Sequence, residues 1–151
     1  MDALRARLGT VGFAPPALRA IAAEVKTWEL RLASDPKTRE WTEGTEFVGH
    51  EADVSGLFSC AVRVTRKMHF GSPGDAWKFL ESVGQGDRLM PARAFGDTRG
   101  VLTSPEDADA AYARYYARGL GAWCSGGVYL YGVVRCRWSV FCRSACLVVS
   151  H

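Results

Sequence analysis

Arginine and tyrosine alternate in one stretch of the C-terminal third. Residues 112–127 read YARYYARGLGAWCSGG, so that Arg114, Tyr116 and Arg118 follow one another at a spacing of two. In a strand these three side chains leave one face, and in a helix Arg114 and Arg118 still share a face. Two guanidinium groups beside a phenol suit a phosphate backbone. A solvated basic face without a ligand is the alternative interpretation.

The charge of the chain is unevenly distributed. Residues 1–55 hold seven Lys/Arg and nine Asp/Glu, a balance of −2, whereas residues 56–151 hold twelve and seven, a balance of +5. From Ala110 onward there is no acidic residue, while five arginines remain. A basic C-terminal part favours an acidic partner such as nucleic acid.

A second basic stretch, Leu57 to Phe70, predicts a strand. Polar and basic residues alternate there with mainly apolar ones, as in a sheet with one solvated face. The alternation places these candidate ligand contacts on one face: Ser59, Arg63, Thr65 and Lys67. An exposed strand without a ligand gives the same pattern.

Two tryptophans are candidate stacking platforms. Trp41 lies in the polar, turn-like sequence 40–44, where a large ring is either a docked anchor or an exposed platform. Trp28 lies on an apolar stripe with helical spacing, which also suits a core residue.

The other elements are predicted from local signals. Proline at the first turn starts a helix at Pro15, which the stripe extends to Asp35. Serine–proline pairs start helices at Ser72, ending at Gly84, and at Ser104. A short helix over 87–95 and a strand over 128–138 complete the prediction, while 139–149 fits strand or helix. We therefore expect one α+β domain over 1–151, with a helical part at 1–55 and a strand and helix core at 56–151.

Signals for catalysis, cofactors and membranes are weak. The three histidines lie in no recognisable catalytic motif, so we expect a protein that is not an enzyme and needs no cofactor. Arginines interrupt the apolar C-terminal run, which argues against a membrane span. Five cysteines without a recognisable signal peptide favour a reduced cytoplasmic or nuclear setting. A zinc site would have to use Cys136, Cys142, Cys146 and His151. Their spacing matches no standard zinc finger, and the cysteines suit buried thiols equally well.

Several motifs resemble one family. Residues 56–96 combine a Gly/Phe-rich start, a strand with basic residues at spacing two and an amphipathic helix. Arg118-Gly119 and then Ser125-Gly126-Gly127 follow further on, and Trp41-Thr42-Glu43 lies upstream. In order and spacing these motifs, about half of the chain, resemble the tombusvirus and aureusvirus RNA-silencing suppressors.

The resemblance implies a homodimer whose sheets, covered by helices on one side, present an open basic face to short RNA duplexes. It implies sequence-independent binding of RNA in the host cytoplasm, and thereby suppression of RNA silencing. By position, the RNA contacts would be Ser59, Arg63, Thr65, Lys67, Arg114, Arg118 and Ser125. Trp41, or else Trp28, would stack on the duplex end.

The chain departs from the family pattern at three places. The family has a second tryptophan three residues after the first, and here that residue is Gly44. Residues 97–111 are longer than the family loop, and 128–138 look strand-like where the family has a helix. A protein-interaction module, viral or not, whose Trp and Tyr residues anchor a partner is the alternative function.

Overall fold

The computed structural model describes residues 9–51, 58–91, 102–115 and 126–136. Its strands are β1 (Thr10–Phe13), β2 (Trp28–Leu32), β3 (Glu46–Glu51), β4 (Ser59–Phe70) and β5 (Val128–Arg135). Its helices are α2 (Pro15–Ala22), α3 (Pro73–Ser82), the 3-10 turn η1 (Gly86–Arg88) and α5 (Pro105–Tyr115). The predicted α+β class is confirmed.

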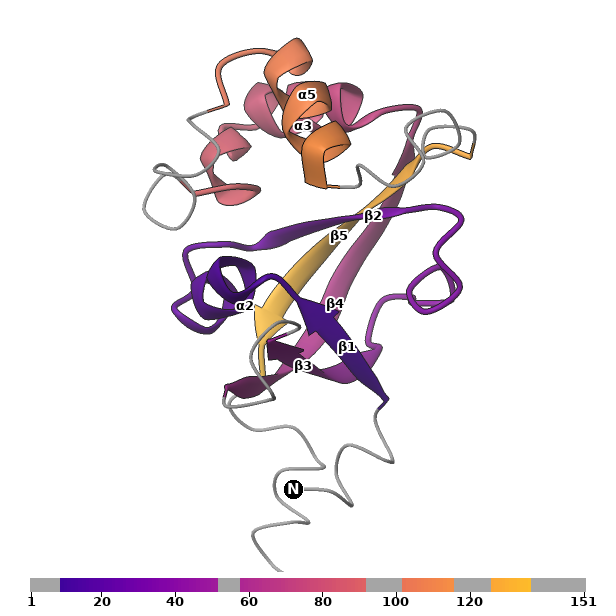
Figure 1. Cartoon of the computed structure of the whole chain (residues 1–151), viewed down its shortest axis with the longest axis vertical. Helices are drawn as coiled ribbons and strands as arrows, with labels where there is room; N and C mark the ends of the chain where they lie inside the picture. Colours follow the sequence, from indigo (N-terminus) through magenta and orange to yellow (C-terminus); the bar gives the residue numbers. More distant parts are fainter. Residues whose placement is uncertain (1–8, 52–57, 92–101, 116–125, 137–151) are drawn as a thin grey trace, which may run out of the picture.

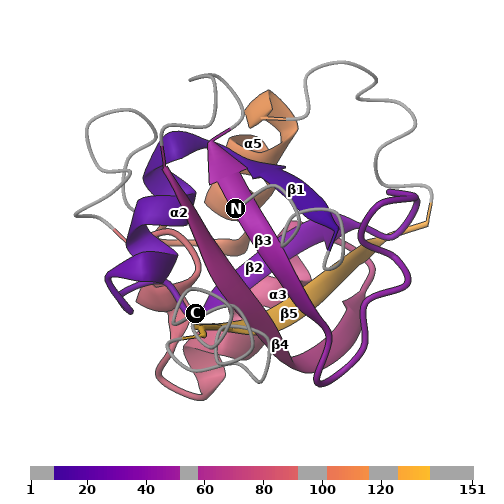
Figure 2. The ribbon, with the colours of Figure 1, turned by 90° about the horizontal axis from the view of Figure 1, so that it is seen from below.

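One mixed sheet holds the strands in the order β1-β3-β4-β5-β2. Only the β1–β3 pair is parallel, and β4, the longest strand, lies at the centre. The sheet is curled, and α3 and α5 form a layer at one end of the molecule while α2 lies at the other (Figures 1 and 2). The central position of β4 means that its side chains decide what each face of the sheet can hold.

The prediction of a helical N-terminal part is wrong. The helix that starts at Pro15 ends at Ala22 instead of Asp35, and β1, β2 and β3 all lie within residues 1–55. Glu24 adopts φ 64°, a left-handed conformation that stops the helix. Trp28 and Leu32 fit a helical stripe by spacing, yet they lie in β2, which pairs with β5. Pairing with β5 overrides the local helical pattern here.

The two faces of the sheet carry two parts of one core. We call the face that carries Phe47, Val62 and Tyr131 the inner face. It packs against α2, and the Leu18 side chain of that helix lies against Gly49. The outer face carries Phe70, which contacts Phe79 of α3 at 5.6 Å between ring centres. Helices therefore cover both faces, whereas the sequence predicted them on one side.

Capping residues fix the two helices of the outer layer, as predicted. The Ser72 hydroxyl accepts a hydrogen bond from the Asp75 N–H, and that of Ser104 accepts one from the Asp107 N–H. Each serine precedes a proline in the first turn, so that both helix starts follow from the sequence. Ala76 and Leu80 of α3 are buried, whereas Val83, which follows its last residue, is 51% exposed.

A bulge interrupts the alternation of β4. Val64 pairs with Val133 and Arg66 pairs with Gly132, so Thr65 is an extra residue opposite β5. Arg63 and Thr65 therefore face outward, and so does Arg66. After the bulge the order is inverted, and Lys67 lies on the inner face opposite Tyr131. The bulge thus divides the basic residues of β4 between the two faces.

None of the helices in the described ranges is long and apolar enough to cross a membrane.

Gly127 should be among the least replaceable residues of the sheet. Its φ is 74°, and an added Cβ would lie 2.4 Å from the Phe70 carbonyl oxygen. We expect Gly127→Ala to lower the free energy of unfolding by about 1–3 kcal/mol in urea denaturation. Gly126→Ala is the matched control, since its nearest neighbour is the Ala33 Cβ at 3.8 Å, and it should change stability by less than about 0.5 kcal/mol. Equal losses in the two variants would contradict this account.

Candidate functional site

The four residues predicted on one face of β4 do not stay together. Arg63 is 44% exposed on the outer face, and its guanidinium contacts the Glu46 carboxylate at 2.7 Å. Ser59 and Thr65 lie on the same side as Arg63, whereas Lys67 lies on the inner side. The prediction of one shared face is therefore wrong for Lys67, because the bulge inverts the alternation.

Lys67 belongs instead to a group of basic and aromatic side chains. Its ammonium group donates a hydrogen bond to the Arg39 carbonyl at 2.6 Å and lies 4.3 Å from the centre of the Tyr129 ring. The His69 ring meets Tyr129 edge to face at 5.4 Å, and its Nε2–H donates to the Gly126 carbonyl. We name this group, drawn from β2, β4, β5 and the turn after β2, the basic–aromatic cluster: Arg31, Arg39, Lys67, His69, Tyr129 and Tyr131.

Neither predicted stacking tryptophan is an exposed platform. Trp41 is 6% exposed and stacks on Phe47 at 4.2 Å, so it is the docked anchor of the turn after β2. Trp28 is 8% exposed, and its ring N–H donates to the Gln85 side chain at 2.6 Å. Both rings are parts of the core, and neither offers a free surface to a duplex end.

The remaining predicted contacts are only partly described. Arg114 is exposed in the last turn of α5, in the helix layer and not in the sheet. Arg118 and Ser125 lie outside the described residues, as do Cys142, Cys146 and His151. Within the described ranges, no group of three His, Cys, Asp or Glu side chains is placed to hold a metal ion.

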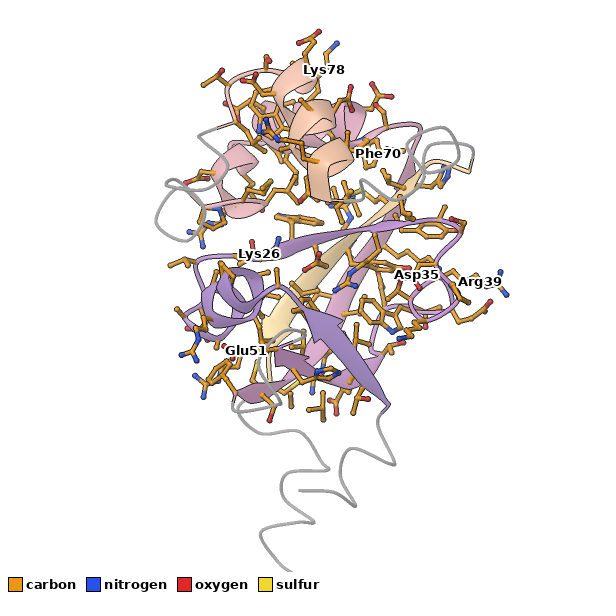
Figure 3. The ribbon with its side chains drawn as sticks, viewed as in Figure 1. Lys26, Asp35, Arg39, Glu51, Phe70 and Lys78 are labelled. Atoms are coloured by element: carbon orange, nitrogen blue, oxygen red, sulfur yellow. The ribbon has the colours of Figure 1, made fainter. Side chains whose placement is uncertain are left out.

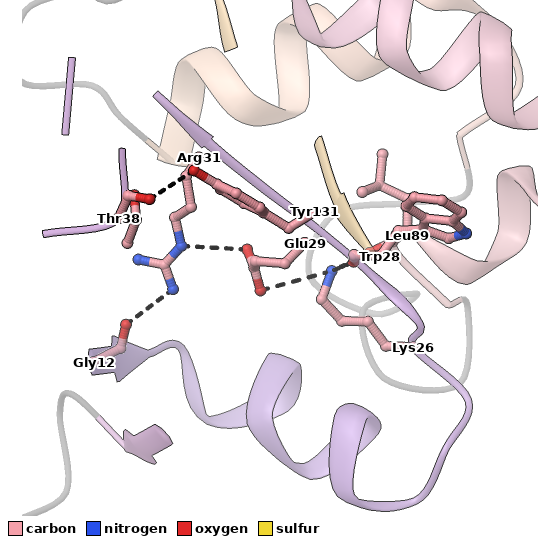
Figure 4. Close-up of polar contacts among 8 residues, drawn as sticks. All are labelled: Gly12, Lys26, Trp28, Glu29, Arg31, Thr38, Leu89 and Tyr131. Atoms are coloured by element: carbon pink, nitrogen blue, oxygen red, sulfur yellow. Dashed lines mark hydrogen bonds and ion pairs between the residues drawn. The ribbon is translucent and has the colours of Figure 1, made fainter. Parts of the chain in front are cut away.

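Two buried charged residues beside Arg31 of the cluster, Lys26 and Glu29, were missed by sequence reasoning, as was Arg31 itself. Lys26 is 2% exposed, and its ammonium group donates to the carbonyls of Trp28 and Leu89. Glu29 lies between two cations, 4.0 Å from Lys26 Nζ and 3.6 Å from Arg31 Nε (Figure 4). Glu29 and Arg31 are two residues apart and share one face of strand β2. The sequence analysis assigned this segment to a helix, so the two charges were not recognised as neighbours on a strand.

Arg31 joins the buried charges to the cluster and bridges the two edges of the sheet. It also donates a hydrogen bond to the Gly12 carbonyl of β1 at 3.1 Å and lies over the Phe13 ring at 4.6 Å. Because β1 and β2 are the two end strands, this side chain spans the gap that the curled sheet leaves open.

Tyr131 forms the floor of the cluster. Its hydroxyl donates a hydrogen bond to the Thr38 carbonyl at 2.6 Å, and its ring packs against Trp41 at 5.1 Å. Burial raises the pKa of Tyr131 above its ordinary value, and the nearby Tyr129 and Asp35 add to the rise. The phenol is therefore a neutral donor under physiological conditions.

The arrangement combines cations with aromatic rings at the surface. Arg39, labelled in Figure 3, is 53% exposed. His69 is also exposed, whereas Lys67 and Tyr129 are partly buried. Cations suit phosphate oxygens, and ring faces suit bases. The cluster thus has the chemistry to hold an anionic ligand with a planar group.

Comparison with known proteins establishes a fold and no more. No family model matches the sequence, and no curated protein matches it significantly. The chain is similar in structure to the hypothetical protein PH0355, with a TM-score of 0.57 and 20% identity over 84% of this chain and 97% of that one. It is also similar to protein PF0455 from Pyrococcus furiosus, with a TM-score of 0.54 and 22% identity over 85% and 97% of the two chains. The names of these two proteins indicate no function.

Tyr131 should make the stability of the protein sensitive to alkaline pH. Since its pKa is raised in the folded chain, the unfolded chain loses the phenol proton first, and the stabilisation fades as pH rises above about 10. We expect Tyr131→Phe to lower the free energy of unfolding by about 1 kcal/mol at pH 8, where the bond to Thr38 is intact. Urea unfolding of both proteins at pH 8, 9 and 10.5 should show the difference narrowing at the highest pH. A constant difference would contradict the raised pKa.

Proposed function

We propose that this protein binds short RNA at the basic–aromatic cluster and does not catalyse a reaction. The observation that carries the proposal is the Lys67 ammonium group held over Tyr129, with the His69 ring against the same tyrosine. A cation suits a phosphate oxygen, and aromatic rings beside it suit the neighbouring base.

The surroundings of the cluster support an extended ligand. Arg39 projects from the turn after β2, and Arg31 lies deeper, 12% exposed, at the gap between β1 and β2. Contacts of this kind recognise the charge and shape of the ligand and do not depend on its base sequence. On the opposite face, Arg63 and Arg66 leave the central strand toward solvent and would give a second, weaker contact with phosphates.

The resemblance to silencing suppressors adds a narrower proposal. Under it, the ligand is a short RNA duplex, the protein acts as a homodimer, and sequestration of the duplex suppresses RNA silencing in a host cell. The buried positions of Trp28 and Trp41 remove one part of that scheme, the measurement of duplex length by stacked tryptophans. Duplex binding then has to rest on phosphate and ribose contacts alone.

A gel-shift titration with Lys67→Ala tests the cluster. We expect the wild-type protein to shift short RNA, and the variant to bind about tenfold more weakly because one charge-assisted contact is lost. A plot of the logarithm of the binding constant against the logarithm of the salt concentration should be less steep for the variant, by about one unit of slope. Lys78→Ala is the matched control, because Lys78 lies on α3 in the helix layer, away from Arg39 (Figure 3), and its affinity should stay within about twofold of wild type.

The ligands in this titration separate the parts of the proposal. A 20-residue RNA duplex, its single strand and the matching DNA duplex are run at two salt concentrations, with size-exclusion chromatography for the dimer. Binding that favours the RNA duplex supports the suppressor scheme, whereas equal binding of the single strand limits the proposal to RNA in general. No shift with any ligand would overturn RNA binding and favour a protein-interaction module. Equal losses in the Lys67 and Lys78 variants would remove the cluster as the site.

A further inference from the structure

Glu29 is a buried carboxylate that the fold leaves incompletely bonded. It lies in the middle of β2 on the inner face, opposite Tyr131, and it is 7% exposed. Its Oε2 atom is buried and has no hydrogen-bond partner among the described residues. Such an atom is costly in a folded chain, because it has lost water without gaining a donor.

The neighbouring cations do not supply the missing hydrogen bond. Lys26 Nζ lies 4.0 Å from Oε2, beyond hydrogen-bond distance, and donates instead to the carbonyls of Trp28 and Leu89. Arg31 Nε lies 3.6 Å from the other oxygen, Oε1. Among the described residues, Oε2 is therefore left without a hydrogen-bond donor.

The two end strands are joined beside Glu29 by a side chain and not by a backbone ladder. In the described sheet no backbone pairing joins β1 to β2, and the Arg31 side chain spans the gap to the Gly12 carbonyl (Figure 4). Rotation of this one long side chain would open the gap beside Glu29 without breaking a strand pair. Tyr131 and Tyr129 lie next to Glu29 and Arg31 on the same face of the sheet, on the strand that pairs with β2.

We infer that Glu29 Oε2 accepts a hydrogen bond from the exocyclic amino group of an unpaired nucleobase that enters between β1 and β2. The inference rests on the RNA binding proposed above and names the part of the ligand that this site selects. A carboxylate is a suitable acceptor for a base amino group, which adenine, cytosine and guanine carry and uracil does not. The nucleotide is unpaired, in a single strand or at the end of a duplex, because a base stacked and paired inside a helix cannot enter the protein to reach a buried acceptor.

The test compares two RNA oligonucleotides that differ by one amino group. Eight-residue oligoadenylate is set against the same length of purine riboside, which stacks alike but lacks the 6-amino group. We expect the wild-type protein to bind oligoadenylate about tenfold more tightly, as for one hydrogen bond to a buried charged group. Fluorescence anisotropy gives both dissociation constants.

Two variants assign the preference to Glu29. Glu29→Leu removes the acceptor and should bind both oligonucleotides equally, while Glu29→Gln keeps a weaker acceptor and should show an intermediate ratio. If Glu29→Leu fails to fold by circular dichroism, the Gln variant decides. Lys67→Ala should weaken the binding of both oligonucleotides and leave the ratio of their dissociation constants unchanged.

The outcomes separate this inference from the proposed function. Equal wild-type binding of the two oligonucleotides, or an unchanged ratio in the Glu29→Gln variant, overturns the role of Glu29 while RNA binding stands. If neither oligonucleotide binds, and the duplex also fails to bind, the proposed function falls and this inference falls with it.

Discussion

The bulge in the central strand determines where the other parts of this structure can lie. One extra residue, Thr65, stands opposite Gly132, and from there on the side chains of β4 change faces. Glycine suits this place, because a Cβ on residue 132 would lie 2.5 Å from the Thr65 hydroxyl and 3.3 Å from the Arg66 Cβ. Without the inversion, Lys67 would point to the outer side and Phe70 to the inner side. The helix layer packs on Phe70, and the basic–aromatic cluster forms around Lys67, so that both depend on this irregularity.

Curling of the sheet creates a second constraint, at the edges. The end strands β1 and β2 approach each other without a backbone ladder, and a side chain has to span the remaining gap. Arg31 does so with a fixed planar group that donates to Gly12 and covers Phe13. Its charge in turn needs a nearby anion, which Glu29 supplies at 3.6 Å. A wholly apolar interior would be at least as stable as this set of buried charges, which is why a role in binding is the more economical explanation of Glu29.

Local signals predicted the elements that local interactions determine. The serine caps of α3 and α5, the strand β4 and the aromatic strand β5 all agree with the structure to within a few residues. Strand β2 could not be predicted in this way, because Trp28 and Leu32 fit a helix and a strand equally well and only pairing with β5 decides between them. The bulge was also beyond reach, since it depends on which residue of a distant strand stands opposite Thr65.

The candidate site shows the same division between local and distant effects. The sequence identified Lys67 as a candidate contact but predicted the wrong side of the sheet for it. For Trp41 it left two alternatives, and the structure shows the docked one, with the ring stacked on Phe47. Lys26, Glu29 and Arg31 were missed because charged residues on a presumed helix suggest a solvated face. Their burial depends on strands that are far away in the sequence.

Motif order and spatial placement lead to different conclusions about the resemblance to silencing suppressors. The motifs follow one another along the chain as in that family, but a shared RNA face requires that Arg63 and Lys67 also lie together in space. The bulge separates them, and the two solved structures that are similar to this chain support a fold without indicating a function. The case for RNA therefore rests on chemistry that can be located in the structure: a lysine over a tyrosine ring, and a buried carboxylate oxygen without a donor. Both lie on the inner face, on the two strands that flank β5, and each stands opposite Tyr131, so one nucleotide could meet both. A ligand that used only the outer arginines would leave both features unexplained.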